Sequence, residues 1–385
     1  TDTAQSIARI NPSTPLSAET GGKNAIILTA SGDRDHAIMN IVTSAFGNAG
    51  QKCSACSLLL VERSVYEDKN FQDKLKDAAT SIKVGSVWEA GNVVGPMITN
   101  RNDKLLQALT LEPGESWLVP PKFIDEKQYI LAPTVKWGVK PGSYSFRTEL
   151  FGPMLSVACI DNLQQGIELV NSLDYGLTSG LQSLDENEQK LWKDSILAGN
   201  LYINRGITGA IVNRQPFGGM KLSAFGGGVK AGGPNYCACL VKITDKPESN
   251  TDYKQSYPHA YEEEFAHARD INKLYGEQNA FRYLPLKNMV LRLFPGDSNE
   301  EAEMIALATK LCHTPLTISF DPNDDRTTAL SSTGCTLKKE TLDEFLKTMR
   351  SYERIRTCGA DIPMEMYEEA ARRNKYIATA KPVKN

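Results

Sequence analysis

The stretch NAIILTASGDRDHAIMNIVTSAFGNAGQKCSACSLLLV, residues 24–61, predicts a strand, a helix and a second strand in succession. Asn24–Thr29 and Ser57–Val61 are short and almost wholly apolar, as expected of strands that are buried on both faces of a parallel sheet. Between them, Asp33–Phe46 places apolar residues at helical spacing. This alternation indicates an α/β fold with a largely parallel sheet and flanking helices.

The same alternation continues on both sides of this stretch. The chain opens with a helical pattern that ends at Pro12, and Phe71–Ile82 is an amphipathic helix. Residues 115–147 mix proline, aromatic and β-branched residues without a helical period, which indicates strands or an extended flap. Further along we expect a strand, two helices and a strand: Leu155–Ile160, Gln164–Leu173, Glu186–Ile196 and Gly199–Ile203.

A polar segment without apolar periodicity, residues 244–255, predicts a linker that follows a domain of residues 20–243. Residues 256–385 predict a small Rossmann-like α/β domain, but they contain no G-x-G-x-x-G motif to support nucleotide binding there. Its expected elements are the helix Glu262–Leu274, the strand Met289–Phe294, the helix Glu300–Leu311, the strand Leu316–Phe320 and the helix Leu342–Arg350.

Composition limits the class of protein. The 385 residues include 43 Lys and Arg against 46 Asp and Glu, a net charge of −3 that argues against a nucleic-acid binder. No apolar run approaches the roughly 20 residues that a membrane-spanning helix needs. The eight cysteines follow no regular spacing, which favours free thiols in a reducing, cytoplasmic setting. They form no usual ligand set with the four histidines, so no metal site is expected.

Cys53, in NAGQKCSACS, lies between the predicted helix and the second strand. A loop in this position can direct backbone N–H groups at a thiol and lower its pKa, which favours a nucleophile. Three further motifs accompany it: ETGGKN with Glu19, TELFGP with Glu149, and PFGGMKLSAFG at 216–226. Residues 205–236 contain nine glycines, which predicts a loop shaped for close backbone approach.

In this order and spacing, the motifs resemble those of the NAD(P)-dependent aldehyde dehydrogenase superfamily, over residues 1–243. ETGGKN is similar to its E-L-G-G-K motif, with Thr20 in place of the usual Leu. GQKC is similar to its nucleophile motif, and TELFGP to its E-x-F-G-P motif.

The resemblance implies a role for each motif. Cys53 would be the nucleophile, with its own backbone N–H as an oxyanion donor, and Glu19 the base for thioester hydrolysis. Glu149 would accept hydrogen bonds from the nicotinamide ribose of NAD, and Phe151 would pack near the nicotinamide. For Glu19 the alternative is an exposed turn carboxylate, and for Phe151 it is simple core packing.

Residues 204–236 look like the corresponding stretch of 1-pyrroline-5-carboxylate dehydrogenases, in particular the dehydrogenase half of bifunctional proline utilization A (PutA) proteins. Residues 256–385 resemble the extra domain that follows it in some of those proteins. This closer resemblance implies NAD-dependent oxidation of L-glutamate 5-semialdehyde, formed from 1-pyrroline-5-carboxylate, to L-glutamate in proline catabolism.

The resemblance also implies how the substrate is held. The backbone N–H groups of Gly209 and Ala210 and the hydroxyl of Ser54 would bind its α-carboxylate. Phe217 would pack against its aliphatic part. Ala210 stands where some relatives have Ser, so it keeps the backbone donor without a hydroxyl. Two arginines, Arg205 and Arg214, are alternative partners for the carboxylate.

The superfamily also has an upstream NAD-binding half, of which residues 1–19 would be a remnant, so residues 1–385 alone are expected to be inactive. If the parent protein is bifunctional, a proline dehydrogenase half would carry FAD and could associate with a membrane. Residues 115–147 resemble the strands through which the superfamily pairs subunits or covers a neighbouring domain. A homodimer or an intramolecular partner is therefore expected at this segment.

Two alternatives stay open at this point. One is an aldehyde dehydrogenase for another short aldehyde, in which the glycine-rich loop holds no carboxylate. The other is a non-catalytic scaffold of the same fold, and the intact set of Cys53, Glu19 and Glu149 argues against it.

Overall fold

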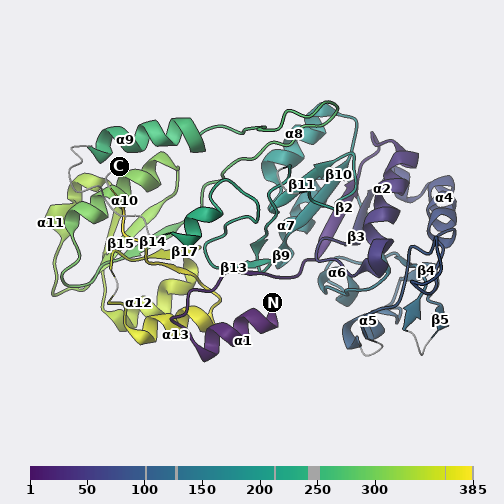
Figure 1. The fold of residues 1–385 in the computed structure, drawn as a ribbon, viewed down its shortest axis with the longest axis horizontal. Helices are drawn as coiled ribbons and strands as arrows, with labels where there is room; N and C mark the ends of the chain where they lie inside the picture. The colour runs from purple at the N-terminus through teal and green to yellow at the C-terminus, as the bar shows by residue number, and fades with distance from the viewer. Residues whose placement is uncertain (100–101, 126–128, 212–213, 242–251, 360, 384–385) are drawn as a thin grey trace. The chain divides into compact units, whose positions relative to one another are not determined.

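A computed structural model describes the chain except for residues 100–101, 126–128, 212–213, 242–251, 360 and 384–385. The described residues form two compact units, drawn in Figure 1. The seven-stranded unit consists of Glu19–Ala210 and Phe217–Ala224, and the five-stranded unit consists of Thr1–Ala18, Ile211–Pro216 and Phe225–Asn385. The predicted linker at 244–255 falls mostly outside the described residues, and helix α9 (Tyr253–Ala260) begins within its last residues.

The seven-stranded sheet has the strand order β11-β10-β2-β3-β8-β7-β4. Every pairing is parallel except the one between β7 and β4, which is antiparallel. The strands are β2 (Asn24–Leu28), β3 (Cys56–Glu62), β4 (Ser116–Val119), β7 (Thr134–Trp137), β8 (Met154–Ile160), β10 (Thr178–Gln182) and β11 (Asn200–Ile203).

Helices cover both faces of this sheet (Figure 1). Ile26 and Leu28 of β2 share a core with α2 and α4, whereas Ala25 and Ile27 share a second core with α7 and α8. Strands that are buried on both faces have continuous apolar sequences, which explains the pattern of residues 24–61. The predicted strand, helix and strand are confirmed there. The four helices are α2 (Arg34–Phe46), α4 (Lys69–Thr80), α7 (Leu163–Asn171) and α8 (Glu186–Ser195).

Strand β10 is absent from the sequence prediction, although it lies inside the sheet between β11 and β2. Its sequence, TSGLQ, is polar and small, unlike that of a typical buried strand. The structure satisfies these polar groups internally. Ser179 Oγ donates to Ala25 O (3.3 Å), and Gln182 Oε1 accepts from Asn40 Nδ2 (3.1 Å). A hydrophobic pattern cannot identify a strand whose burial is stabilised by hydrogen bonds.

The five-stranded unit contains a fully parallel sheet of order β16-β15-β14-β17-β18. This is the doubly wound order of Rossmann-like folds, and it confirms the predicted α/β class. Helix α10 packs on one face of the sheet, and α12 and α13 pack on the other. The elements are β14 (Met289–Arg292), α10 (Asn299–Leu311), β15 (Leu316–Phe320), β16 (Thr336–Lys339), α12 (Leu342–Thr348), β17 (Arg354–Arg356), α13 (Met364–Arg372) and β18 (Ile377–Ala378).

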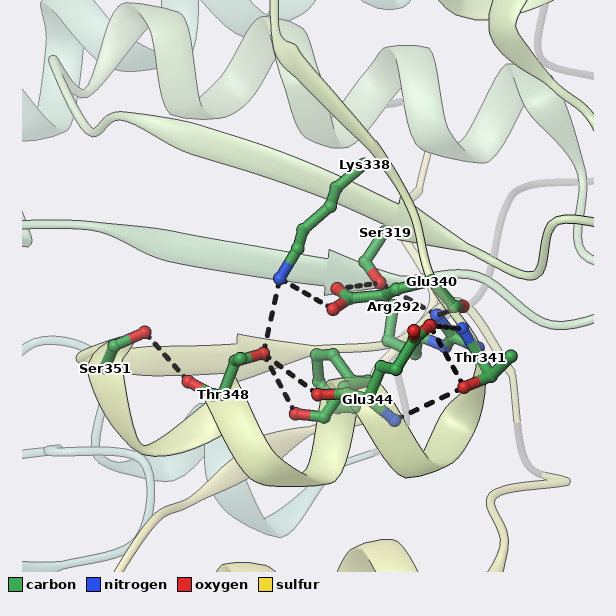
Figure 2. A network of polar contacts seen from close by, with 9 residues as sticks. Arg292, Ser319, Lys338, Glu340, Thr341, Glu344, Thr348 and Ser351 are labelled. Atoms are coloured by element: carbon green, nitrogen blue, oxygen red, sulfur yellow. Dashed lines mark hydrogen bonds and ion pairs between the residues drawn. The ribbon is translucent and has the colours of Figure 1, made fainter.

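A buried polar network joins the carboxyl ends of three of these strands (Figure 2). Arg292, 2% exposed at the end of β14, donates from Nη1 to Ser319 Oγ (2.8 Å) and Glu340 O (2.9 Å). Ser319 Oγ donates to Glu340 Oε1 (2.7 Å), and Lys338 pairs with Glu340 Oε2 (2.6 Å). The ends of β14, β15 and β16 are therefore held together by charge-assisted hydrogen bonds.

The predicted helix Glu262–Leu274 is wrong beyond Phe265, where a π-helical turn that extends α9 ends. The carboxylate of Asp270 accepts hydrogen bonds from three backbone N–H groups, at 2.9–3.2 Å: those of Asn272, Lys273 and Asn279. Such bonds compete with helix formation, and they lower the pKa of Asp270.

The other elements are short. The described part of 115–147 contains four strands, in line with the predicted strands, and two of them belong to the seven-stranded sheet. No helix among the described residues has the length and apolar character to cross a membrane. The remaining elements are α1 (Asp2–Ile10), β1 (Ala18–Glu19), α3 (Arg63–Tyr66), α5 (Asp103–Ala108), β5 (Phe123–Asp125), β6 (Ile130–Leu131), α6 (Tyr144–Arg147), β9 (Tyr175–Gly176), β12 (Met220–Lys221), β13 (Ala224–Phe225) and α11 (Thr327–Leu330).

Candidate active site

Three predicted site residues lie in segments that lead into neighbouring parallel strands. Glu19 precedes β2, Cys53 precedes β3, and Glu149 precedes β8. Because β2, β3 and β8 are adjacent and parallel, their amino ends lie at one edge of the sheet. The fold therefore brings together residues that are far apart in the sequence.

The loop before Cys53 has an uncommon backbone. Asn48, Ala49 and Gly50 have positive φ angles of 57°, 54° and 66° in succession. Non-glycine residues adopt this conformation at an energetic cost, and such strain is concentrated at functional sites. Gly50 also has no room for a side chain, because a Cβ would lie 2.2 Å from Gly152 O. The loop that carries Cys53 is thereby packed against the turn that contains Gly152.

The side chain of Cys53 reaches solvent, and its thiol has a raised pKa. Partial desolvation of the sulfur is the largest cause, and the carboxylates of Glu149 and Glu19 add to it. The backbone N–H groups of Ser54 and of Cys53 itself lower the pKa, as the sequence predicts, but the net direction is upward. Attack at neutral pH therefore needs a base to accept the thiol proton, and both carboxylates lie close enough to influence the sulfur.

Cys56, three residues further on, has a different environment. It is 1% exposed at the start of β3, and its thiol donates to Leu58 O (3.3 Å). Burial raises its pKa to about 12. Cys53 and Cys56 are both free thiols, so the exposed one is the better nucleophile of the two.

Two buried polar residues at the start of β2 support the Cys53 loop. Asn24, 1% exposed, donates from Nδ2 to Cys53 O (2.7 Å) and to Ala55 O (3.0 Å). Lys23, 2% exposed, donates from Nζ to Ser57 O (3.3 Å). Burial lowers the pKa of Lys23 to about 7, against the opposing influence of Cys56 and Glu149. Neither role is predicted from the sequence, although a lysine and an asparagine directly before an apolar run are an unusual pattern that points to buried polar contacts.

Glu149 is partly buried, and its Oε1 accepts a hydrogen bond from the backbone N–H of Gly22 (2.9 Å). Burial raises the pKa of Glu149, and the Gly22 bond partly offsets this effect. Gly21 lies so close that a Cβ there would be 2.0 Å from Glu149 Oε2. The two glycines of ETGGKN therefore make room for the carboxylate of the second motif.

Phe151 is 40% exposed and has a positive φ of 49°. An aromatic ring held at the surface by a left-handed backbone is unusual, which argues against simple core packing. The turn is tied down by Asn102, whose Nδ2 donates to Leu150 O (2.7 Å). A small pocket joins this turn to the Cys53 loop, and its lining includes Gly22, Gly50, Lys52, Glu149, Phe151 and Gly152.

The predicted substrate residues lie in two places. Ser54, 5% exposed, follows the nucleophile directly. Gly209 and Ala210 lie in the segment after β11, where Gly209 has a positive φ of 82°, and Phe217 follows them. Glu19 and Glu149 lie close enough to Cys53 for their carboxylates to raise the pKa of its thiol. That the Gly209 segment also lies near Cys53 stays a prediction.

Comparison with known proteins identifies the family of the chain. The model of the aldehyde dehydrogenase family matches residues 1–244. The chain therefore belongs to the aldehyde dehydrogenase family, as its motifs predict.

Within this family, the chain is similar to 1-pyrroline-5-carboxylate dehydrogenases and to PutA. A 1-pyrroline-5-carboxylate dehydrogenase of Geobacillus kaustophilus is 36% identical over 221 residues, which cover 57% of this chain and 42% of the relative. The solved structure of PutA from Corynebacterium freiburgense matches 98% of this chain and 38% of that chain, with 37% identity and a TM-score of 0.80. A Thermus 1-pyrroline-5-carboxylate dehydrogenase with bound NAD matches 58% of this chain and 42% of that chain, with 34% identity and a TM-score of 0.54. The predicted similarity to both groups is confirmed, and this chain spans less than half the length of each relative.

Proposed function

We propose that the protein containing this chain oxidises L-glutamate 5-semialdehyde to L-glutamate, with NAD as the hydride acceptor. The observation that carries the proposal is an exposed cysteine, Cys53, at a sheet edge where the carboxylates of Glu19 and Glu149 also lie. The relatives named 1-pyrroline-5-carboxylate dehydrogenase support this choice of substrate.

The reaction would proceed in two halves. The Cys53 thiol loses its proton to a carboxylate and its sulfur attacks the aldehyde carbon, giving a tetrahedral oxyanion that the Cys53 N–H stabilises. Bound NAD would supply the acceptor for the hydride that leaves this carbon. Glu19 then takes a proton from water, the water oxygen attacks the thioester, and the Cys53 sulfur leaves.

The residues of the small pocket fit the reactive end of NAD. The carboxylate of Glu149 suits a pair of ribose hydroxyl groups, because an ionised carboxylate only accepts hydrogen bonds. The exposed ring of Phe151 suits the flat face of a nicotinamide. We therefore assign Glu149 and Phe151 to this end of the cofactor.

For the α-carboxylate of the substrate we propose the N–H groups of Gly209 and Ala210 with the hydroxyl of Ser54, and for its aliphatic part Phe217. The left-handed backbone at Gly209 supports this assignment, because such turns present N–H groups to anions. Arg214 is a weaker alternative, since it pairs with Glu277 (3.4 Å) within the five-stranded unit.

We also propose a cytoplasmic protein in which residues 115–147 contact a second copy or another domain of the same protein. Phe123 and Ile124 of β5 are 38% and 45% exposed, which supports a contact there. Sedimentation of a strict monomer, with protease cleavage confined to this segment, would contradict the contact. FAD would enter only through a proline dehydrogenase domain of the parent protein.

A substrate comparison tests the proposed function. We expect the full enzyme to show a higher kcat/KM for glutamate semialdehyde than for propanal, and Cys53→Ala to abolish both activities. A clear preference for propanal would contradict the substrate assignment while leaving the family unchanged.

A further inference from the structure

The side chain of Asn24 connects three backbone groups around the nucleophile. Its Nδ2 donates to Cys53 O (2.7 Å) and Ala55 O (3.0 Å), and its Oδ1 accepts from the N–H of Thr178 (3.0 Å). Asn24 is 1% exposed, so water does not compete for these bonds. The carbonyl groups on both sides of Ser54 are thereby attached to the first residues of β2 and β10.

The geometry of the peptide bond gives this attachment a consequence for the sulfur. The carbonyl of Cys53 and the N–H of Ser54 belong to one planar trans peptide, so they point in opposite directions. A carbonyl that is held on Asn24 therefore fixes the direction of the Ser54 N–H. This N–H is one of two backbone donors that favour the thiolate of Cys53, the other being the N–H of Cys53 itself.

We propose that Asn24 is a positioning residue that turns the Cys53–Ser54 peptide so that its N–H faces the Cys53 sulfur. The importance of this role for catalysis rests on the proposed function. The effect of Asn24 on the reactivity of the Cys53 thiol does not depend on the substrate. The other groups that act on the sulfur are the carboxylates of Glu149 and Glu19. Substitution of Asn24 leaves both of them in place.

The pH dependence of alkylation tests the proposal. Full-length enzyme is treated with iodoacetamide from pH 6 to pH 10, and modification of Cys53 is followed by peptide mass spectrometry. Asn24→Leu has nearly the same volume and lacks the amide, so its alkylation midpoint should move up by about one pH unit, the loss of one hydrogen bond to the thiolate. A folded Asn24→Leu enzyme with an unchanged midpoint would overturn the proposal.

Asn171 provides a matched control in the same unit. Its Nδ2 donates to Ser195 O (2.9 Å) and its Oδ1 accepts from the N–H of Leu197 (2.8 Å), which is the same pattern of backbone bonds away from the nucleophile. Asn171→Leu should lower the melting temperature without moving the midpoint. An equal shift in Asn171→Leu and Asn24→Leu would show a general effect on the fold, and would also overturn the proposal.

A second variant and a kinetic measurement complete the test of Asn24. If Asn24→Leu does not fold, Asn24→Ala removes the same bonds with less steric demand, and the same shift is expected. In pre-steady-state kinetics, acylation of Cys53 should slow while the KM for the aldehyde changes little. Alkylation needs no substrate, so an enzyme that prefers another aldehyde would refute the proposed function and still test the role of Asn24.

Discussion

At the scale of single residues, two chemically identical side chains differ in exposure and pKa because their environments differ. Cys53 and Cys56 are three positions apart, yet one thiol is exposed beside two carboxylates and the other is buried with a pKa of about 12. The motif GQKC predicts that Cys53 is the nucleophile, and its exposure fits that prediction. It did not predict the net direction of the Cys53 pKa, because this depends on carboxylates that only the fold brings near the sulfur.

Lys23 gives a prediction at the same scale. Its pKa is lowered from 10.5 in the unfolded chain to about 7 by burial, so folding expels a proton between these pH values. The cost to stability grows as the pH falls from about 10.5 to about 7 and is constant below. Lys23→Met should therefore remove a cost of up to about 4 kcal/mol at pH 7, and the gain in stability should become small near pH 10.

Denaturant unfolding at several pH values measures this effect. Lys52→Met, which changes an exposed lysine nearby, should have little influence at any pH. A gain that is independent of pH, or a loss of stability at pH 7, would contradict the assigned environment of Lys23.

At the scale of elements, the prediction succeeded where burial is apolar and failed where it is polar. Asn24–Leu28 and Met289–Arg292 were recognised as strands from their apolar runs, whereas Thr178–Gln182 was missed because its burial depends on side-chain hydrogen bonds. The helix expected at 262–274 failed for a related reason, since Asp270 binds three backbone N–H groups that helical pattern analysis ignores. Apolar periodicity therefore does not predict polar bonds, whether they join neighbouring strands, as at Ser179, or form within a turn, as at Asp270.

The loop that precedes Cys53 gives the second prediction. Gly50→Ala places a Cβ 2.2 Å from Gly152 O and forces alanine into a left-handed conformation that costs about 1–2 kcal/mol by itself. We expect a lower melting temperature and slower alkylation of Cys53. Gly47→Ala is the control, because Gly47 has a φ of −53° and no neighbouring atom within 4 Å of its Cβ position. Equal behaviour of the two variants would refute the close packing at Gly50.

The network at the ends of β14, β15 and β16 gives the third prediction (Figure 2). Arg292→Met removes the buried guanidinium that donates to Ser319 Oγ and to the backbone carbonyl of Glu340, while the Glu340 carboxylate keeps Lys338 and Ser319 as partners. The loss of these hydrogen bonds from a charged donor should destabilise the five-stranded unit by about 1.5–3 kcal/mol in denaturant unfolding. Arg350→Met, at an exposed position, should change stability by less than about 0.5 kcal/mol. If Arg292→Met lost no more stability than Arg350→Met, the network would contribute little to the stability of the five-stranded unit.

At the scale of the whole molecule, the fold class followed from one stretch, residues 24–61, and the site from four motifs. The roles of the motifs come from their resemblance to the family, and three of the motifs lead directly into strands of one sheet: the segment of Glu19 into β2, that of Cys53 into β3 and that of Glu149 into β8. Gly209, Ala210 and Phe217, which are proposed to hold the substrate, could not be placed relative to Cys53 by this reasoning, since they lie outside the strands of this sheet.

The fourth prediction concerns residues 1–385 as a separate protein. We expect no measurable NADH production and no NAD binding at millimolar concentration. Orientation of bound reactants is typically worth ~7–11 kcal/mol of barrier, and Glu149 and Phe151 alone do not provide it. The full enzyme is the positive control. Micromolar NAD affinity of residues 1–385 in calorimetry would contradict this prediction and would place the cofactor site within them.

The central claim is that Cys53 forms the covalent bond to the aldehyde carbon and Glu19 directs the release of the product. The measurement that tests it most directly is mass spectrometry of full-length Glu19→Gln enzyme, quenched during reaction with glutamate semialdehyde and NAD. We predict one glutamyl group on the peptide that carries Cys53, a single burst of NADH, and a steady-state rate reduced about 10²–10⁴-fold. An acyl group on any other residue, or turnover at the rate of the unsubstituted enzyme, would contradict the claim.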